Sequence, residues 1–423
     1  MSHIDRNFQT IAKTSLVVPS DPRFLSGLVD TYYRDRIQNT RSLGEILRGR
    51  SPRATSVLLH TNDYLSIAND PRLVRAEVRA LEEVGHGDAV SRALVPDLDD
   101  AIGKFEQRIA RILGAEAAVM GASGYCANTG LLQSIASPEV PVYIDMKAHA
   151  SLWEGVQLSR ATARPFRHND PEHLERQVRQ YGPGIIVVDA LYSTTGTLAP
   201  LSAMVVVAET HGCVMVADET HSFGVQGPGG AGVAAAQGVA HRVHFRTIGL
   251  SKAMGGRGGV VACSARNAEF FRYTSNPMIF STAVLPHEVA GFHAVLDIVE
   301  SERWRRERVR ASHAYLCDGL DDLGYNVDDS DAQIIALEAG PEAAVVVLRD
   351  ALEDNDVFGS VFCAPATPKN RALVRMTINA SLTREQLDHV LAACARIRKQ
   401  VGQADWASSR RRKGRNRLAA AAD

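Results

Sequence analysis

The sequence lacks the features that mark several large classes of protein. No apolar run among its 423 residues approaches the ~18 residues needed to span a bilayer, and MSHIDRNFQT at the start has no basic segment leading into an apolar one. The six cysteines contain no C-x-x-C pair, so neither a zinc site nor a disulfide framework is indicated. These absences predict a cytoplasmic protein with reduced thiols, no metal and no membrane span.

Net charge is also nearly absent, because 47 Lys+Arg oppose 48 Asp+Glu and leave a formal charge of −1. Nucleic-acid proteins normally carry a basic surplus, so no nucleic-acid partner is expected. The last residues, SSRRRKGRNRLAAAAD, form a basic stretch typical of a disordered, solvated tail. Without the six positive charges between Arg410 and Arg417, the body of the chain is acidic.

Apolar runs alternate with amphipathic segments over most of the chain. Runs such as IIVVDA (185–190) and CVMVAD (213–218) predict strands that are covered on both faces. Such strands indicate an α/β fold with a large, mostly parallel sheet wrapped by helices. The expected strands are 117–120, 141–145, 184–190, 213–217, 243–248 and 259–263, between helices at 71–84, 97–113, 125–136, 150–160 and 201–211.

A second pattern begins after a long helical stretch that ends near residue 322. Short strands near 332–337, 357–363 and 373–378 alternate there with helices at 341–354 and 382–400, which predicts a smaller α+β domain. The expected organisation is an N-terminal arm (1–60), a large domain (61–300), a small C-terminal domain (301–400) and the basic tail (401–423).

Polar residues with complementary chemistry follow two of the predicted strands. Asp218 ends one strand, with His221 three residues later, and Lys252 follows the strand 243–248 in a loop of small residues. Ligands of doubly wound sheets bind at these carboxyl ends. An amine for a Schiff base and an acid for a pyridine nitrogen suit pyridoxal phosphate, and the turn ASGY (122–125) before a helix suits its phosphate.

Competing motifs are weaker. GPGGAG (227–232) has the glycines of a dinucleotide fingerprint, but it follows no strand directly and contains Pro228. Ser151, Ser193 and Ser222 lack the G-x-S-x-G context of a serine hydrolase.

Six segments, in order, resemble motifs of the α-oxoamine synthases, and the resemblance runs from about residue 56 to 400. This family of fold-type-I pyridoxal-phosphate enzymes condenses an amino acid with an acyl-coenzyme A. The segments are TNDYLSIANDP (61–71), ASGYCANTGLLQ (122–133), YIDMKAHASLWEG (143–155), DETHSFGVQGPGGAG (218–232), LSKAMGG (250–256) and FSTAVLP (280–286).

Other runs resemble one branch of that family, the α-hydroxyketone autoinducer synthases of bacterial quorum sensing. They lie largely outside the shared cofactor motifs, so they bear on the substrate class. Besides YIDMKAHASLWEG, they are RHNDPEHL (167–174), YGPGIIVVDALYSTTGTLAPL (181–201) and VFGSVFCAPATPKN (357–370).

The resemblance implies a role for individual residues. Lys252 is the expected Schiff-base lysine and proton-transfer base, and Asp218 is the expected partner of the pyridine nitrogen. His221 is expected to hydrogen-bond the ring hydroxyl, and His149 to stack on the ring. The family builds its sites at a homodimer interface, and further expected contacts are Ser123, Gly124, Tyr125 and Ser193 to the cofactor, Thr282 to the phosphate in the neighbouring subunit, and Arg375 and Asn62 to the substrate.

Several positions depart from the family pattern. Gly249 stands where the family usually has a Thr or Ser for the phosphate, so Thr247 or Ser251 is expected to replace that hydroxyl. The family's glycine-rich stretch is only half retained in GHGDAVSR (85–92). Asp189 replaces a Glu, and the His that follows the arginine strand is absent at Asn379–Ser381. The last two changes agree with the autoinducer branch and predict a different substrate pocket.

The predicted activity is therefore a pyridoxal-phosphate-dependent acyl transfer. A small amino acid such as 2-aminobutyrate, or S-adenosylmethionine, is condensed with a medium- to long-chain acyl-coenzyme A and decarboxylated to an α-aminoketone, the precursor of an α-hydroxyketone signal. The alternatives are synthesis of 8-amino-7-oxononanoate, 2-amino-3-ketobutyrate or aminolevulinate on the same scaffold. A non-catalytic DNA-associated regulator is a third reading, but no helix-turn-helix segment supports it.

Overall fold

The computed structural model describes residues 20–38, 42–87, 90–95 and 98–413, and the chain divides into two compact units, Met1–Gly49 and Arg50–Asp423. The first unit contains α1 (Arg23–Tyr33), the π-helical turn η1 (Arg34–Gln38) and α2 (Leu43–Leu47). The predicted arm, 1–60, is too long, because β1 (Val57–Leu58) belongs to the second unit, where it pairs in parallel with β10 (Val357–Phe358).

A seven-stranded sheet forms the larger part of the second unit, in the order β2-β8-β7-β6-β5-β3-β4. Within this sheet β8 is antiparallel to both neighbours and the other strands are parallel, which confirms the predicted sheet. The strands are β2 (Ala117–Gly121), β3 (Val142–Asp145), β4 (Ala163–Phe166), β5 (Ile185–Asp189), β6 (Val214–Asp218), β7 (Phe245–Gly249) and β8 (Gly259–Cys263).

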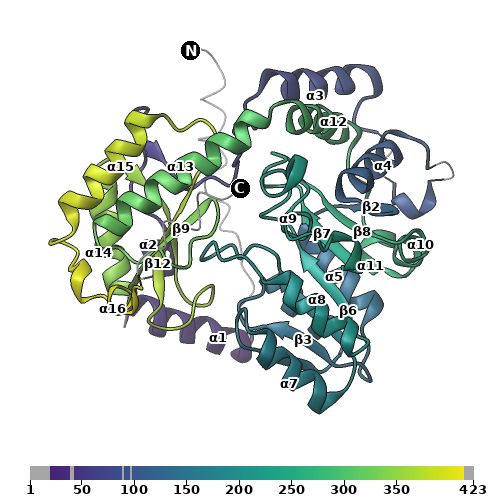
Figure 1. Cartoon of the computed structure of the whole chain (residues 1–423), viewed down its shortest axis with the longest axis horizontal. Helices are drawn as coiled ribbons and strands as arrows, with labels where there is room; N and C mark the ends of the chain where they lie inside the picture. Colours follow the sequence, from purple (N-terminus) through teal and green to yellow (C-terminus); the bar gives the residue numbers. More distant parts are fainter. Residues whose placement is uncertain (1–19, 39–41, 88–89, 96–97, 414–423) are drawn as a thin grey trace. The chain divides into compact units, whose positions relative to one another are not determined.

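Helices cover both faces of this sheet (Figure 1). Alternate strand residues enter different core clusters: Val187 packs in one with Leu131 and Leu152, and Val188 in another with Met204. The helices are α3 (Pro71–Val84), α4 (Ala101–Leu113), α5 (Gly124–Ile135), α6 (Ala150–Leu158), α7 (Pro171–Tyr181), α8 (Leu201–Thr210), α9 (Val233–Ala236), α10 (Ala265–Thr274), α11 (Asn276–Ile279) and α12 (Pro286–Ser301), with short turns η2 (Arg92–Leu94), η3 (Pro228–Gly230) and η4 (Ala240–Arg242).

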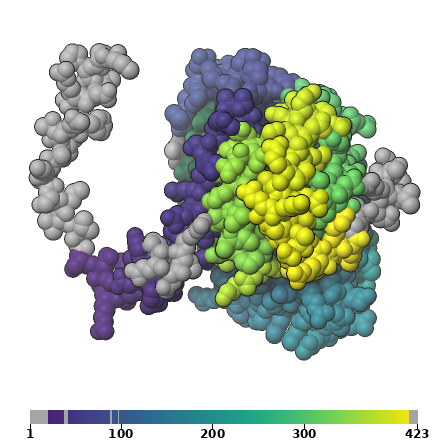
Figure 2. All heavy atoms as spheres, turned by 90° about the vertical axis from the view of Figure 1, so that its left-hand side faces the viewer, coloured from purple at the N-terminus to yellow at the C-terminus, as the bar shows by residue number. Residues whose placement is uncertain are grey.

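A smaller antiparallel sheet, in the order β11-β12-β9, forms the α+β part that the sequence predicts. Its strands are β9 (Ile334–Gly340), β11 (Ser360–Phe362) and β12 (Ala372–Thr377). The helices that accompany it are α13 (Arg303–Asp322), α14 (Glu342–Glu353), α15 (Arg384–Ile397) and α16 (Ala407–Arg411). The yellow residues of α15 and α16 gather on one face of the molecule in Figure 2.

The chain remains folded beyond residue 400, where the sequence predicts a disordered tail (401–423). The turn η5 (Gln403–Asp405) leads to Trp406, which is 6% exposed and donates its indole N–H to Val401 O at 3.0 Å. Arg411 and Arg412 pair with Glu338 and Asp321, each at 2.7 Å. Burial of an aromatic ring and these ion pairs outweigh the polar composition, and residues 414–423 lie outside the described range.

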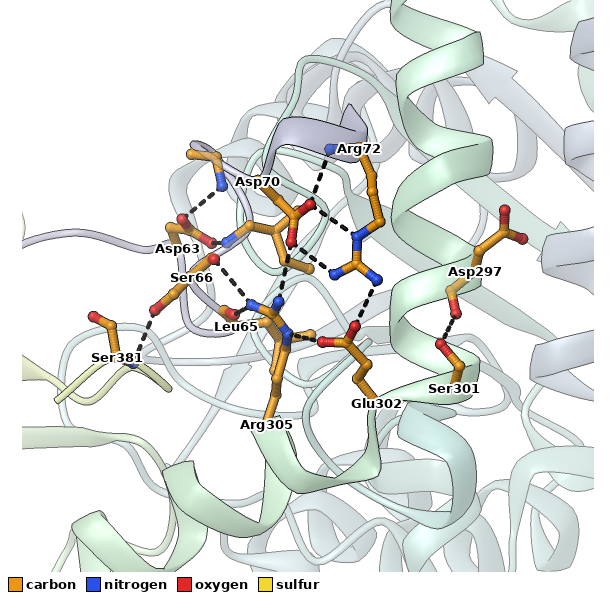
Figure 3. Close-up of polar contacts among 12 residues, drawn as sticks. Asp63, Leu65, Ser66, Asp70, Arg72, Asp297, Ser301, Glu302, Arg305 and Ser381 are labelled. Carbon is orange, nitrogen blue, oxygen red and sulfur yellow. Dashed lines mark hydrogen bonds and ion pairs between the residues drawn. The ribbon is translucent and has the colours of Figure 1, made fainter. Parts of the chain in front are cut away.

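An ion-pair cluster anchors the segment that precedes α3 (Figure 3). Asp70 caps α3 and accepts hydrogen bonds from Arg72 and from Arg305 of α13. Arg305 also donates to the carbonyls of Leu65 and Ser66 at 2.6 and 3.0 Å. Residues 65–70 are thus tied to α13, which fixes the path of the chain just after residues 62–64.

None of the helices in the described part of the chain is long and apolar enough to cross a membrane.

Candidate functional site

Three neighbouring parallel strands each end in a buried aspartate: Asp145 on β3, Asp189 on β5 and Asp218 on β6. Asp218 Oδ2 accepts a hydrogen bond from Asn128 Nδ2 at 2.6 Å, and its Oδ1 accepts one from the backbone N–H of Thr220 at 2.8 Å. Each oxygen of the Asp218 carboxyl group therefore has a donor, and the two hydrogen bonds fix its orientation at the end of the strand.

Lys252 lies in the loop between β7 and β8, three residues after the strand ends at Gly249. Burial lowers the pKa of its ammonium group and the Arg375 guanidinium lowers it further, whereas the Asp218 carboxylate raises it. The result is an amine that loses its proton more easily than an exposed lysine does. This is the property that imine-forming lysines need.

His149 is the N-cap of α6 and is exposed. Its backbone N–H donates to Asp189 Oδ2 at 2.8 Å, and its ring Nδ1 lies 2.8 Å from Ser151 Oγ. Ser151 Oγ also accepts from Asn128 Nδ2 at 2.9 Å. Backbone and ring are therefore both held, and the exposed ring has a defined orientation for stacking.

His221 is buried, and its Nδ1 lies 2.7 Å from Tyr64 Oη. Burial lowers the pKa of His221 well below its usual value, and the charges of Lys252 and Arg375 lower it further. Burial raises the pKa of the Tyr64 phenol, so the phenol remains protonated and can donate to Nδ1 of a neutral His221. A neutral imidazole that accepts at Nδ1 carries its hydrogen on Nε2, where it can serve a ligand.

The N-terminus of α5 forms an anion cradle. Ser123 caps the helix, with its Oγ accepting from Cys126 N at 3.1 Å. The first N–H groups of the helix have no partner within the helix and favour an anion. A Cβ on Gly124 would lie 2.6 Å from the Cα of Gly249, so only glycine permits this close approach of helix and loop.

The hydroxyl beside Gly249 belongs to Thr220, which the sequence analysis did not single out. Gly249 N donates to Thr220 Oγ1 at 2.7 Å, and a Cβ on Gly249 would lie 3.0 Å from Thr220 Cγ2. Thr247 is instead buried in the sheet, in register with Asp218, with an unpaired hydroxyl among the described residues. Ser251 is exposed. Thr220 therefore occupies the space that a side chain at 249 would need.

Arg375 on β12 is 5% exposed, and it brings Asn62 and Ser193 together. Its Nη1 donates to Ser193 O at 3.0 Å and its Nη2 to Asn62 Oδ1 at 3.1 Å, while the guanidinium lies 4.6 Å from the centroid of the Phe362 ring. Its Nε is buried and has no partner in the part of the chain that is described. A buried guanidinium with a free donor is suited to a carboxylate ligand.

A cavity of about 780 Å³ lies against His149 and Tyr125. Its volume is typical of a small-molecule site. Phe362 belongs to its wall, so the cavity and Arg375 share one aromatic ring. The other apolar lining residues include Met146, Trp153, Pro365, Pro368 and Leu373.

Two predicted contact residues are less closely integrated. Tyr125 follows Gly124 at the start of α5, with its hydroxyl on Glu154 and its ring edge-on to His149 at 6.3 Å between centroids. Thr282 is exposed between α11 and α12, and its role in a neighbouring subunit remains a prediction.

Asn128 and Tyr64 are further site residues that sequence reasoning missed. Both lie inside segments that resemble the family, but their contacts join residues 90 and 157 positions apart. Asn128 lies one helical turn after Gly124, and this spacing is the signal that could have indicated a second residue facing the same ligand.

Comparison with known proteins identifies the family. The profile of the class I and II aminotransferases matches residues 54–394. The chain is 38% identical to the CAI-1 autoinducer synthase of Vibrio campbellii over 88% of this chain and 94% of the relative. It is 36% identical to the 8-amino-7-oxononanoate synthase of Geobacter sulfurreducens over 82% of this chain and 90% of the relative.

The chain belongs to the α-oxoamine synthase family.

Solved structures of this family have the same fold. Serine palmitoyltransferase from S. paucimobilis, solved with a bound adduct of pyridoxal phosphate and myriocin, has a TM-score of 0.79 at 30% identity, with 82% of this chain and 88% of that chain covered. Serine palmitoyltransferase from Sphingomonas wittichii has a TM-score of 0.81 at 26% identity, with 90% and 99% covered. The predicted fold-type-I architecture is confirmed.

Pyridoxal 5′-phosphate is the cofactor of this α-oxoamine synthase. The residues present fit it. The glycine-lined end of α5 has no room for a Cβ at Gly124 and offers N–H groups for the phosphate. Asp218 offers a carboxylate for the pyridine nitrogen, and Lys252 offers an amine of lowered pKa.

Proposed function

We propose that this α-oxoamine synthase joins a small amino acid, or S-adenosylmethionine, to a medium- or long-chain acyl-coenzyme A and releases carbon dioxide. The product is an α-aminoketone, the precursor of an α-hydroxyketone autoinducer. The observation that carries this proposal is the largely apolar cavity beside His149, which shares Phe362 with Arg375. The cavity can hold an acyl chain next to a carboxylate-bearing donor. The name of the Vibrio relative supports the same product class.

Pyridoxal phosphate, when bound, supplies an electron-withdrawing ring that stabilises negative charge at the donor Cα. Asp218 would hold a proton at the pyridine nitrogen, and His221 would hydrogen-bond the ring hydroxyl. His149 would stack on the ring. Ser123, Gly124 and Tyr125 would bind the phosphate at the start of α5, with the hydroxyl of Thr220 beside Gly249.

Lys252 and Arg375 act on the amino donor. Lys252 Nζ would hold the cofactor by its carbonyl group and would move the Cα proton of the donor, as its lowered pKa permits. Arg375 binds the donor carboxylate, and Asn62 and the Ser193 carbonyl orient its guanidinium. A bond forms between the donor Cα and the thioester carbon, the C–S bond breaks, and coenzyme A leaves as the thiol with the proton taken from Cα. The bond between Cα and the donor carboxylate then breaks, carbon dioxide leaves, and a proton from solvent is added at Cα.

The functional form is a homodimer in the cytoplasm, with Thr282 reaching the phosphate in the neighbouring subunit. The six cysteines form no disulfide within the described part of the chain, which suits a reducing compartment. The exposure of Thr282 leaves it accessible to a second copy of the chain.

The Lys252→Ala variant tests this proposal. It should lose both the visible absorbance of the protein-bound cofactor and the release of coenzyme A from acyl-coenzyme A, because Nζ is removed. Lys104→Ala, an exposed lysine on α4, is the matched control and should keep both. Multiple turnovers by Lys252→Ala would exclude the assigned role.

The alternative is another reaction of the family, the synthesis of 8-amino-7-oxononanoate, 2-amino-3-ketobutyrate or aminolevulinate. The 36% identity to the Geobacter 8-amino-7-oxononanoate synthase favours the first of these. Thiol release with a panel of amino donors and acyl chains separates the two proposals. A strong preference for short or dicarboxylic acyl groups favours the alternative.

A further inference from the structure

Two carboxyl groups lie side by side at the edge of the sheet where the cofactor binds. Asp189 and Asp218 are partners in the register of the parallel strands β5 and β6. Val187 and Val216, two residues before them, pack in one core cluster, so both aspartates point to the same face. Neighbouring strands lie about 4.8 Å apart. Two ionised carboxylates at this spacing would repel each other strongly in a buried site.

Hydrogen-bond donors are distributed unequally among the strand-end aspartates. Asp145 points to the opposite face and accepts from the N–H groups of Lys147 and Asn169 and from His168 Nδ1, at 2.8, 2.9 and 3.0 Å. Asp218 accepts from a side-chain amide and a backbone N–H. Within the described residues, Asp189 accepts one hydrogen bond, from the N–H of His149.

The surroundings of Asp189 also disfavour its charge. It is 3% exposed, and the titratable groups around it are Asp218 from β6, Tyr192 from the segment after β5, His149 from α6 and, on the opposite face of the sheet, Asp145 from β3. The two neighbouring carboxylates oppose ionisation. Burial raises the pKa of Asp189 well above its usual value, and the Asp218 charge raises it further.

We propose that only one of these two neighbouring carboxyl groups is ionised and that Asp189 is the one that keeps its proton. Asp189 is then a neutral positioning residue, which holds the backbone of His149 while Asp218 alone carries the negative charge for the pyridine nitrogen. This inference rests on the proposed role of Asp218. The proton on Asp189 explains how two aspartates can lie side by side in a buried site, because a second ionised carboxylate would destabilise the first.

Infrared spectroscopy of the full-length holoenzyme tests the proton directly. A protonated carboxyl group has a C=O stretching band that ionised carboxylates lack. At neutral pH, the difference spectrum between the wild type and Asp189→Asn should show the loss of this band. Loss of carboxylate bands alone would overturn the proposal. If Asp189→Asn does not fold, the wild type labelled with ¹³C at the aspartate side chains answers the same question, since absence of the shifted C=O band also overturns it.

Cofactor binding gives a second readout that is independent of acyl transfer. Asp189→Asn keeps the shape, the neutrality and the acceptor for His149, so the Kd of pyridoxal phosphate should stay within about threefold of wild type. Asp218→Asn removes the charge and should weaken binding roughly 10- to 100-fold. Asp189→Leu leaves His149 N–H without its acceptor, so it should alter the absorbance of the bound cofactor, and Asp189→Asn should restore it.

Equal losses of affinity in Asp189→Asn and Asp218→Asn would contradict the proton assignment. If the wild type shows the C=O band but catalyses no acyl transfer, the proposed function is contradicted and the proton assignment stands.

Discussion

The contacts of the Arg375 guanidinium indicate the kind of ligand that this residue binds. Its guanidinium is buried, yet its partners are an amide oxygen and a carbonyl oxygen, both neutral, and its Nε is unpaired among the described residues. A buried cation without an anionic partner is costly in a folded protein. This cost is consistent with selection for a carboxylate ligand.

Replacing Arg375 by Lys tests that role. Lys keeps the charge and loses the planar pair of donors, so the KM for the amino donor should rise roughly 10- to 100-fold while kcat changes less. Initial rates at varied donor concentration measure both quantities. The matched control is Arg384→Lys, an exposed arginine on α15, which should leave the KM unchanged. A fall in kcat at constant KM would argue against carboxylate binding.

The side chain of Thr220 fills the space beside Gly249, so a side chain at 249 should fit only when the side chain at 220 is made smaller. Gly249→Thr places a Cβ about 3.0 Å from Thr220 Cγ2, so this variant should bind pyridoxal phosphate more weakly than wild type. Adding Thr220→Ala frees the space and the Gly249 amide, so the double variant should regain much of the affinity. Absorbance titration with the cofactor measures it. A double variant no better than Gly249→Thr would show that the two side chains do not share one space.

The site could be predicted only in part at this scale. Lys252, Asp218 and His221 follow apolar strands, so sequence alone indicated a shared edge. Asn128, Tyr64 and Thr220 were missed because their contacts depend on how α5, the segment before α3 and the loop after β6 meet in space. Spacing along the chain does not encode such contacts.

At the scale of elements, the segment 61–70 links stability to the site. It carries Asn62 and Tyr64, which contact Arg375 and His221, and the Asp70 cluster fixes its other end (Figure 3). Arg72, and to a smaller extent Arg305, hold the pKa of the Asp70 carboxyl well below its usual value. A carboxyl whose pKa is lowered by folding stabilises the fold above its unfolded pKa and loses that effect as pH falls.

The Asp70→Asn variant should therefore be less stable at neutral pH by about 1–3 kcal/mol, since it loses charged hydrogen bonds to two arginines. The difference from wild type should shrink below about pH 4, the ordinary range of an aspartate in the unfolded chain. Urea unfolding across this pH range measures it. Glu82→Gln, an exposed carboxylate on α3 itself, is the control. A difference that is independent of pH would contradict the electrostatic explanation.

Most elements were predictable because buried parallel strands are continuous apolar runs. The strands β5 and β6 and the helix α3 lie within a residue or two of their expected limits. The strand β4 and the helix α7 were missed. The sequence of β4, ARPF, contains an Arg and a Pro, and this strand is only partly buried at the sheet edge. The folded segment 401–413 was also missed, because its large buried apolar residues are only Val401 and Trp406, in a basic stretch.

At the scale of the whole molecule, the site joins two sheets. Asp218 and Lys252 come from the seven-stranded sheet and its loops, whereas Arg375 comes from the three-stranded sheet. The near-zero net charge of the chain does not show where its charges lie. In the structure, the basic residues Arg411 and Arg412 form ion pairs with acidic residues in the body of the chain. Under the proposed function, Lys147 and Arg371, which line the cavity, are the cations available to a polyanionic acyl carrier.

The proposed shared site of the homodimer predicts complementation between subunits. Lys252→Ala and Thr282→Val should each lower thiol release in homodimers. Mixed dimers should regain activity, because one of their two sites then has both Lys252 from one chain and Thr282 from the other. Co-expression with two affinity tags yields such dimers for assay. Mixed dimers without recovery would place Thr282 outside the neighbouring site.

The most direct test of the account is mass spectrometry of the product made by the purified holoenzyme from a mixed acyl-coenzyme A pool and a small amino donor. We predict an α-aminoketone whose mass equals acyl group plus donor minus carbon dioxide, made from medium or long acyl chains and absent with Lys252→Ala. A product that retains the carboxylate, a product from short or dicarboxylic acyl groups alone, or no C-acylated product would contradict the proposed function.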